Sequence, residues 1–197
     1  MHRQNKRLWL LVSACWTLAL VFALVRSAAA SEPHWALPSL RVLEDLGVVG
    51  PDTNIRVDLD QPISPLEWQL WLGQALYPKM GPDWATNSGF GREIDTFSGW
   101  EPGKYRSILT RGAAIGGLTK LGKLLDFIPE TSPGWPILLD RFNDKESLLK
   151  TGLAVPFEIM LAAGVIHGYP DVSLRPEVPL TRAEAASLLL LWLELMN

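Results

Sequence analysis

The stretch that decides the fold runs from Ala163 to Leu193 and reads AGVIHGYPDVSLRPEVPLTRAEAASLLLLWL. Gly164 is suited to end a preceding helix, because glycine adopts the left-handed conformation at a helix C-terminus without a Cβ penalty. The loop after it is closed by Thr181-Arg182-Ala183-Glu184, which is typical of a capping box at the start of an apolar helix. The stretch therefore predicts a unit made of a helix, a loop and a capped helix.

The same unit occurs a second time, 117 residues earlier, and the alignment needs no gap. An internal repeat constrains an architecture more strongly than local propensity does. Ser64 and Glu67 form the capping box of this earlier copy. The aligned segments are Gly47-Val48-Val49 with Gly164-Val165-Ile166, Pro62-Ile63-Ser64 with Pro179-Leu180-Thr181, and Glu67 with Glu184.

A third, weaker copy lies between these two and begins at Leu109-Thr110-Arg111. No glutamate follows to close its capping box, and its apolar helix contains Gly116, Gly117 and Gly122. Each interior glycine costs a helix about 0.5 to 1 kcal/mol relative to alanine, so we expect this helix to pack closely against a neighbour. The residues before it, 80–104, are rich in turn formers and predict a long surface loop.

The tryptophans divide into two groups by their position in this pattern. Trp68 and Trp71 recur at helical spacing on an apolar helix and are predicted to lie in the core. Trp84, Trp100 and Trp135 fall in loops rich in glycine and proline. A large ring there either anchors the loop or contacts a polymer or a partner protein.

The N-terminal 30 residues predict export. A basic stretch ending at Lys6-Arg7 precedes apolar residues 8–25 and Ala28-Ala29-Ala30, as in a secretory signal cleaved after Ala30. A retained membrane anchor is the alternative, because 18 apolar residues are the lower limit for crossing roughly 30 Å at about 1.5 Å per residue. Cys15 also resembles a lipoprotein site, although the residues after it stay apolar. Each reading places the folded part outside the cytoplasm.

Charge and composition exclude several classes of protein. Without residues 1–30, the chain has 14 basic and 21 acidic residues, a net charge of −7 that argues against a nucleic-acid partner. Cys15 is the only cysteine, and His34 and His167 alone do not make a metal site. The chain has no nucleophile elbow, phosphate-binding loop or zinc-protease helix. The sequence therefore predicts a protein that is not an enzyme and needs no cofactor.

The run from Ala162 to Asp171, with Leu174-Arg175-Pro176 and the segment from Pro179 to Glu184, resembles the consensus of the S-layer homology (SLH) family. Phe142-Asn143-Asp144 fits the opening of the same module, and His34-Trp35-Ala36 fits the helix start of the first copy. The resemblance implies an all-α fold of three pseudo-threefold helix-loop-helix repeats after the signal or anchor. The predicted domains are 1–30 for that N-terminal segment, 33–80 for repeat 1, 81–128 for a degenerate repeat 2, and 140–196 for repeat 3.

The resemblance also implies a function, which is non-covalent attachment to the bacterial cell wall. Proteins of this family bind an anionic, often pyruvylated, secondary cell-wall polysaccharide in grooves between repeats. Arg182 is the strongest candidate, because its planar guanidinium can bind a carboxylate in two places at the N-terminus of a helix. The residues that the resemblance assigns to polysaccharide binding are Arg182, Arg111, Asp171, Gly168 and Trp35.

Departures from the family pattern leave a second function open. Pro65 replaces the arginine in the first copy, Val172 stands where the family prefers glycine, and Gly152 stands where it prefers tryptophan. We therefore expect at most two equipped grooves. The alternative is a membrane-tethered envelope scaffold or protein-interaction module with a degenerate SLH fold and no glycan binding, whose partner is another envelope protein. The membrane is a partner only if residues 8–25 are retained.

Overall fold

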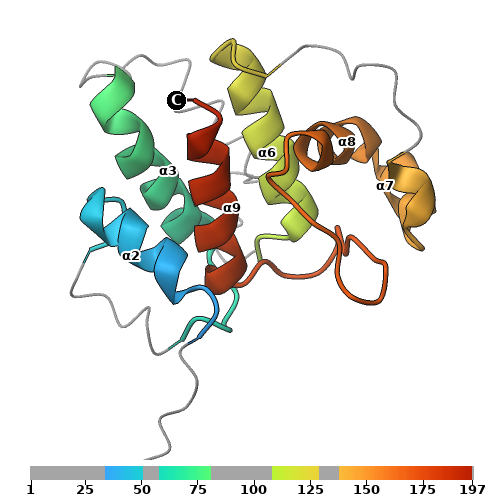
Figure 1. The fold of residues 1–197 in the computed structure, drawn as a ribbon, viewed down its shortest axis with the longest axis horizontal. Helices are drawn as coiled ribbons and strands as arrows, with labels where there is room; N and C mark the ends of the chain where they lie inside the picture. Colours follow the sequence, from blue (N-terminus) through green and yellow to red (C-terminus); the bar gives the residue numbers. More distant parts are fainter. Residues whose placement is uncertain (1–33, 51–57, 81–107, 129–137, 197) are drawn as a thin grey trace, which may run out of the picture. The chain divides into compact units, whose positions relative to one another are not determined.

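The computed structural model describes residues 34–50, 58–80, 108–128 and 138–196, and Trp35–Asn197 form one compact unit (Figure 1). Its described residues form helices and no strand, as the sequence predicts. None of these helices combines the length and the apolar character needed to cross a membrane. The elements are α2 (Leu37–Asp45), α3 (Pro65–Met80), α6 (Arg111–Leu124), the 3₁₀ helix η2 (Leu139–Arg141), α7 (Lys145–Thr151), α8 (Ala154–Ala162) and α9 (Arg182–Glu194).

Three helices, α3, α6 and α9, begin at a hydroxyl side chain. Each hydroxyl accepts a hydrogen bond from the backbone N–H three residues later, which satisfies one of the free donors of the first turn. In α9 the Glu184 carboxylate also accepts from Thr181 N at 3.1 Å, so its capping box is complete. The three hydroxyl caps are Ser64 with Glu67 N (3.1 Å), Thr110 with Ala113 N (3.2 Å) and Thr181 with Glu184 N (3.2 Å).

Glycines end α2 and α8 where the sequence predicts it. Gly47 and Gly164 both have a φ of +72°, which L side chains rarely adopt. Gly152 has the same φ at the C-terminus of α7. The turns after α2 and α8 therefore have the same geometry, and both lead into a loop before a capped helix.

The loops before the capped helices join neighbouring units through matching backbone hydrogen bonds. At the N-termini of α9 and of α6, three backbone hydrogen bonds connect the cap segment with the loop of another unit. The bonded residues of the two sets occupy equivalent positions in the repeat. Figure 1 shows the result, with α9 between α3 and α6. The α9 set is Ala183 N to Leu59 O (2.9 Å), Arg182 N to Gln61 O (2.9 Å) and Ile63 N to Leu180 O (2.8 Å); the α6 set is Gly112 N to Pro176 O (2.7 Å), Arg111 N to Val178 O (2.9 Å) and Leu180 N to Leu109 O (2.9 Å).

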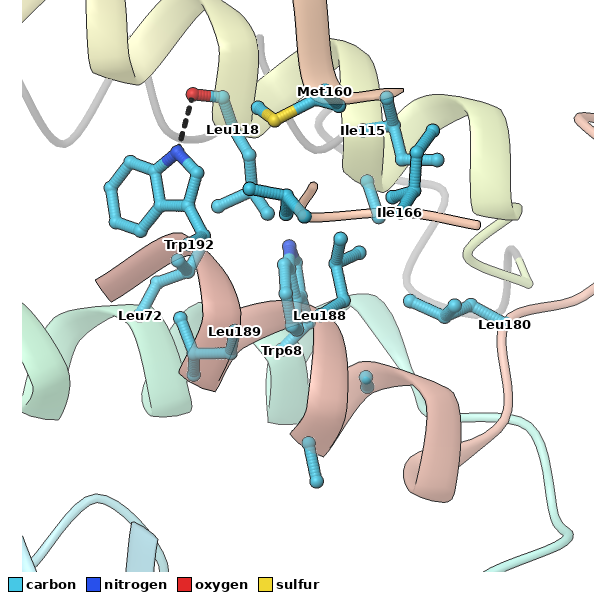
Figure 2. Close-up of a cluster of buried hydrophobic side chains, with 14 of the residues drawn as sticks. Trp68, Leu72, Ile115, Leu118, Met160, Ile166, Leu180, Leu188, Leu189 and Trp192 are labelled. Atoms are coloured by element: carbon cyan, nitrogen blue, oxygen red, sulfur yellow. Dashed lines mark hydrogen bonds between the residues drawn. The ribbon is translucent and has the colours of Figure 1, made fainter. Parts of the chain in front are cut away.

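One apolar core lies among α3, α6, α8 and α9 (Figure 2). Trp68 is 1% exposed and Trp71 is 3% exposed, which confirms the prediction that both are core residues. Trp192 is fully buried, and its indole N–H donates to Leu118 O at 3.1 Å. The buried indole is therefore hydrogen-bonded, and this bond ties α9 to α6.

The glycines of α6 allow close packing, as predicted. A Cβ on Gly112 would lie 2.7 Å from Leu153 Cδ1 and 2.8 Å from Pro176 O. A Cβ on Gly122 would overlap the Ile128 side chain. These contacts offset the poor helix propensity of glycine, because a larger residue would push away the segment that packs on α6.

Some predictions concern residues that the structure does not describe. The signal or anchor at residues 1–30 is one of them, and residues 81–107 of the predicted degenerate repeat 81–128 are another. Trp84, Trp100 and Trp135 also lie outside the described ranges. The interpretations of these residues stay predictions.

Candidate binding groove

A groove of about 470 Å³ lies where α6, α9 and the loop after α8 meet. Arg111, the first residue of α6, contributes the cation of its lining. Residues 165–170 form one wall, and Glu184, Ser187, Leu188 and Leu191 of α9 form another. Trp35, just before α2, completes the rim with a side chain that is 61% exposed. The groove thus combines apolar surface, the aromatic rings of Trp35 and Tyr169, one guanidinium and one carboxylate.

Arg111 is buried, with only 7% of its surface exposed. Its Nη2 donates to His167 O at 3.1 Å, and its Nη1 lies 4.0 Å from Glu184 Oε1. Among the described residues, its Nε has no hydrogen-bond partner. A buried charged donor without an acceptor is costly, so the protein itself satisfies this guanidinium incompletely.

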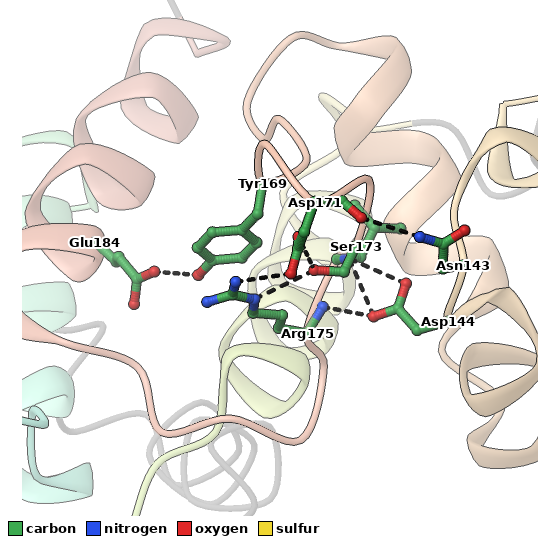
Figure 3. Close-up of polar contacts among 8 residues, drawn as sticks. Asn143, Asp144, Tyr169, Asp171, Ser173, Arg175 and Glu184 are labelled. Carbon is green, nitrogen blue, oxygen red and sulfur yellow. Dashed lines mark hydrogen bonds and ion pairs between the residues drawn. The ribbon is translucent and has the colours of Figure 1, made fainter.

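Tyr169 ties the loop after α8 to α9 (Figure 3). Its hydroxyl donates to Glu184 Oε1, and its ring lies 4.1 Å from the Arg175 guanidinium and 5.1 Å from that of Arg111. Burial, followed by the hydrogen bond to Glu184, raises the pKa of Tyr169 to about 12. The phenol is therefore neutral at physiological pH and can keep donating to Glu184.

Gly168 lies close against the ring of Phe142. A Cβ at this position would lie 3.0 Å from Phe142 Cζ and closer still to another atom of the ring. The Phe142 ring is rigid and buried, so it cannot move aside cheaply. Gly168 lines the groove, and its packing explains why no side chain fits here.

Asn143 and Asp144 hold the far side of this loop (Figure 3). The Asp144 carboxylate accepts from Leu174 N at 3.0 Å and from Arg175 N at 2.7 Å. Asn143 donates from its backbone N to Val172 O at 2.9 Å and from Nδ2 to the backbone oxygen of Asp171 at 3.0 Å. The sequence match placed these two residues at the opening of the module. It did not reveal that they hydrogen-bond to the loop after α8, which we call the groove loop.

Asp171 lies in the same loop but does not line the groove. Its carboxylate binds Arg175 Nη2 at 2.9 Å and Ser173 Oγ at 2.5 Å. These two bonds lower the pKa of Asp171, the bond from Ser173 most of all. The described contacts of the Asp171 carboxylate thus stay within its own loop, and the predicted role of Asp171 in polysaccharide binding stays a prediction.

Arg182 also lies outside the groove and has a carboxylate partner in the protein. Its Nε donates to Glu67 Oε1 at 2.8 Å, and its Nη1 donates to Asp58 O at 3.4 Å. The hydrogen bond to Glu67 raises its pKa. Arg182 faces Glu67 as Arg111 faces Glu184, so each arginine lies near the glutamate of the next capped helix.

The structure brings three of the five predicted residues together. Trp35, Arg111 and Gly168 line the groove, whereas Asp171 and Arg182 do not. Sequence reasoning missed Tyr169 as the link between loop and helix, although the Gly168-Tyr169-Pro170 motif contains it. In the described residues, no group of three or more His, Cys, Asp or Glu side chains is placed to hold a metal ion. The arrangement suits a ligand with a carboxylate beside an apolar or sugar-like surface.

Comparison with known proteins locates the same region. Residues 156–186 match the family model of the S-layer homology domain. The matched segment covers most of α8, the groove loop and the first residues of α9, so it includes Gly168, Tyr169 and Glu184. No curated protein matches the chain.

Proposed function

We propose that this chain, which carries an S-layer homology domain at residues 156–186, attaches non-covalently to the bacterial cell wall by binding an anionic secondary cell-wall polysaccharide. S-layer homology domains are binding modules that anchor proteins to the cell wall. The chain is therefore associated with the cell surface or wall. Its proposed ligand contacts are Arg111, Trp35 and the backbone at Gly168.

The observation that carries this proposal is the guanidinium of Arg111 in the lining of the groove. Its Nη1 lies 4.0 Å from Glu184 Oε1, which is longer than a hydrogen bond, so a carboxylate in the groove offers this guanidinium a closer acceptor. A carboxylate is the best acceptor for a guanidinium, because a charge-assisted hydrogen bond is about twice as strong as a neutral one. Arg111 thus favours a carboxylate ligand over a neutral sugar.

The apolar residues beside Arg111 favour a pyruvylated polymer among the anionic polysaccharides. A pyruvyl ketal places one carboxylate and one methyl group on a sugar ring. The carboxylate would bind Arg111, while Leu188 and Leu191 offer apolar surface for the methyl group. Trp35 is exposed at the rim, where an aromatic ring can stack against a neighbouring sugar.

The matching hydrogen bonds at the caps support the three-repeat architecture as part of the proposal. In it, α3, α6 and α9 are the capped helices of repeats 33–80, 81–128 and 140–196. Residues 1–30 serve as the export signal or as a retained anchor. Binding of this kind involves no reaction and no cofactor.

The experiment is co-sedimentation of the full chain, in mild detergent, with peptidoglycan sacculi that carry the secondary polysaccharide or have been stripped of it. We expect the chain to pellet only with unstripped sacculi. Arg111→Gln and Trp35→Ala should each reduce the pelleted fraction, whereas Arg41→Gln on the surface of α2 should not.

The exposed position of Trp35 makes its variant a safe test, because removing the ring leaves the core intact. Circular dichroism would confirm that both variants keep the helical content of the parent. A helical chain that fails to pellet with unstripped sacculi would contradict the proposal and favour the protein-scaffold function.

A further inference from the structure

His167 belongs to the lining of the groove, and it is an exposed residue. Its backbone is held on both sides, because Ile166 is 3% exposed in the core and Gly168 lies against the Phe142 ring. The backbone oxygen of His167 also accepts from Arg111 Nη2 at 3.1 Å. The imidazole is therefore attached to a residue whose backbone binds the guanidinium of the groove.

The formal charges of the groove lining cancel while this imidazole is neutral. Of the described residues that line the groove, Arg111 contributes a fixed positive charge and Glu184 contributes a carboxylate. Tyr169 is a neutral phenol that donates to Glu184. A ligand carboxylate that binds Arg111 thus enters a lining without net charge and meets Glu184 as a like charge. A second cation in the lining would offset this repulsion.

The charged side chains of the groove loop do not supply that second cation. Arg175 lies over the Tyr169 ring at 4.1 Å and binds the Asp171 carboxylate at 2.9 Å. Neither Arg175 nor Asp171 is part of the described lining. His167 is therefore the lining residue whose protonation changes the charge that an anion meets near neutral pH.

We propose that His167 is the second cationic contact for the carboxylate in the groove, and that its protonation strengthens binding as the pH falls. This inference rests on the proposed attachment to an anionic polysaccharide. A histidine side chain ordinarily changes its charge between about pH 5 and 8, whereas carboxyl groups ordinarily stay ionised above about pH 5. A protonated His167 gives the lining a net positive charge and a donor for a charge-assisted hydrogen bond. Attachment to the wall is then tighter in mildly acidic surroundings.

The first test is co-sedimentation of the full chain, in mild detergent, with unstripped sacculi at about pH 5.5 and about pH 8. We expect the unmodified chain to bind about fivefold more tightly at the lower pH, the upper range for an exposed ion pair. His167→Gln should lose this difference and bind weakly at both values. His167→Arg carries its charge at both values and should bind tightly at both.

The matched control is His34→Gln, because His34 is a described histidine outside the groove lining. It should keep the pH response of the unmodified chain. Three results would overturn the role of His167 alone: a chain that pellets equally at both pH values, a response that persists in His167→Gln, or a response that disappears in His34→Gln. Failure to pellet at either pH would contradict the proposed function and this inference with it.

The second test measures proton uptake when polysaccharide fragments bind. If the bound anion favours the charged imidazole, the imidazole must hold its proton more tightly in the complex, because the coupling of two binding equilibria is reciprocal. Titration calorimetry at about pH 7, in two buffers of different ionisation enthalpy, gives the number of protons taken up. We expect fractional uptake by the unmodified chain and none by His167→Gln. Equal uptake by the two proteins would refute the contact between His167 and the ligand.

Discussion

Arg111 and Arg182 occupy the same position after a threonine cap, yet their surroundings differ. Arg182 donates to Glu67 at 2.8 Å, and Glu67 has no tyrosine partner among the described contacts. Arg111 lies 4.0 Å from Glu184, whose oxygens already accept from Tyr169 and from Thr181 N. Glu184 is thus shared with Tyr169, and its distance to Arg111 is longer than that of Glu67 to Arg182. Of the two equivalent arginines, Arg182 has a short ion pair and Arg111 lines the groove.

Replacing each arginine by glutamine should give the largest difference in polymer binding between the two positions. Arg111→Gln should reduce polymer binding about tenfold or more, because a charge-assisted hydrogen bond contributes about 1.5 to 3 kcal/mol. Arg182→Gln should change binding less than about twofold. Equilibrium pelleting with sacculi measures both. A larger loss in Arg182→Gln would reverse the assignment of the two arginines.

Gly168→Ala should be the most destabilising single change in the groove loop. The added methyl group meets the buried ring of Phe142, so we expect a loss of about 2 kcal/mol in the free energy of unfolding. Urea denaturation monitored by circular dichroism would measure it. Unchanged stability would show that the loop moves away from Phe142 without cost.

The Arg182–Glu67 pair can be measured by a double-mutant cycle with both residues changed to alanine. The side chains are 24% and 19% exposed, so we expect a coupling of about 1 kcal/mol rather than the larger value of a buried pair. The same urea experiment provides the four free energies. Zero coupling would remove the reason for treating Arg182 as structural.

Val172→Gly should stabilise the protein by about 0.5 kcal/mol. Val172 has a φ of +60°, which is unfavourable for a β-branched residue and free of strain for glycine. Part of that gain is lost to the greater entropy of glycine in the unfolded chain. Val155→Gly on α8 is the matched control and should destabilise. A loss in both variants would show that the loop is not strained at Val172.

The pH dependence of stability should show an effect of Tyr169 only at strongly alkaline pH. The pKa of Tyr169 is raised from 10.0 to about 12, so the folded state holds this proton more tightly than the unfolded state. The contribution is complete below pH 10 and disappears as the pH rises toward 12. Tyr169→Phe should remove this contribution, so the free energy of unfolding of the variant should fall less between pH 10 and 12. An identical alkaline profile in both proteins would contradict the raised pKa.

The sequence predicts the helices well, because their signals are local. The hydroxyls that begin α3, α6 and α9 and the glycines that end α2 and α8 act within one turn of the chain. Trp68 and Trp71 were predicted to be buried from their spacing alone. The last copy resembles the SLH consensus, and residues 156–186 match the family model of the S-layer homology domain.

The groove could not be predicted to the same extent, because its chemistry depends on distant contacts. The contacts of Arg111 and Arg182 are with Tyr169, Glu184 and Glu67, which lie far from them in sequence, apart from Glu184 beside Arg182. Asp144 organises the loop from 30 residues away, and the consensus does not state its partners. Val172, which has a left-handed backbone, accepts from Asn143 N and donates to Tyr169 O in this loop.

Binding of polysaccharide fragments before and after mild acid removal of the pyruvyl ketal tests the central claim most directly. Titration calorimetry of the full chain should show binding to the intact fragments, no binding to the depyruvylated ones, and a loss of about tenfold or more in Arg111→Gln. Equal affinity for both kinds of fragment, unchanged by Arg111→Gln, would contradict the assignment of the groove to a carboxylate ligand.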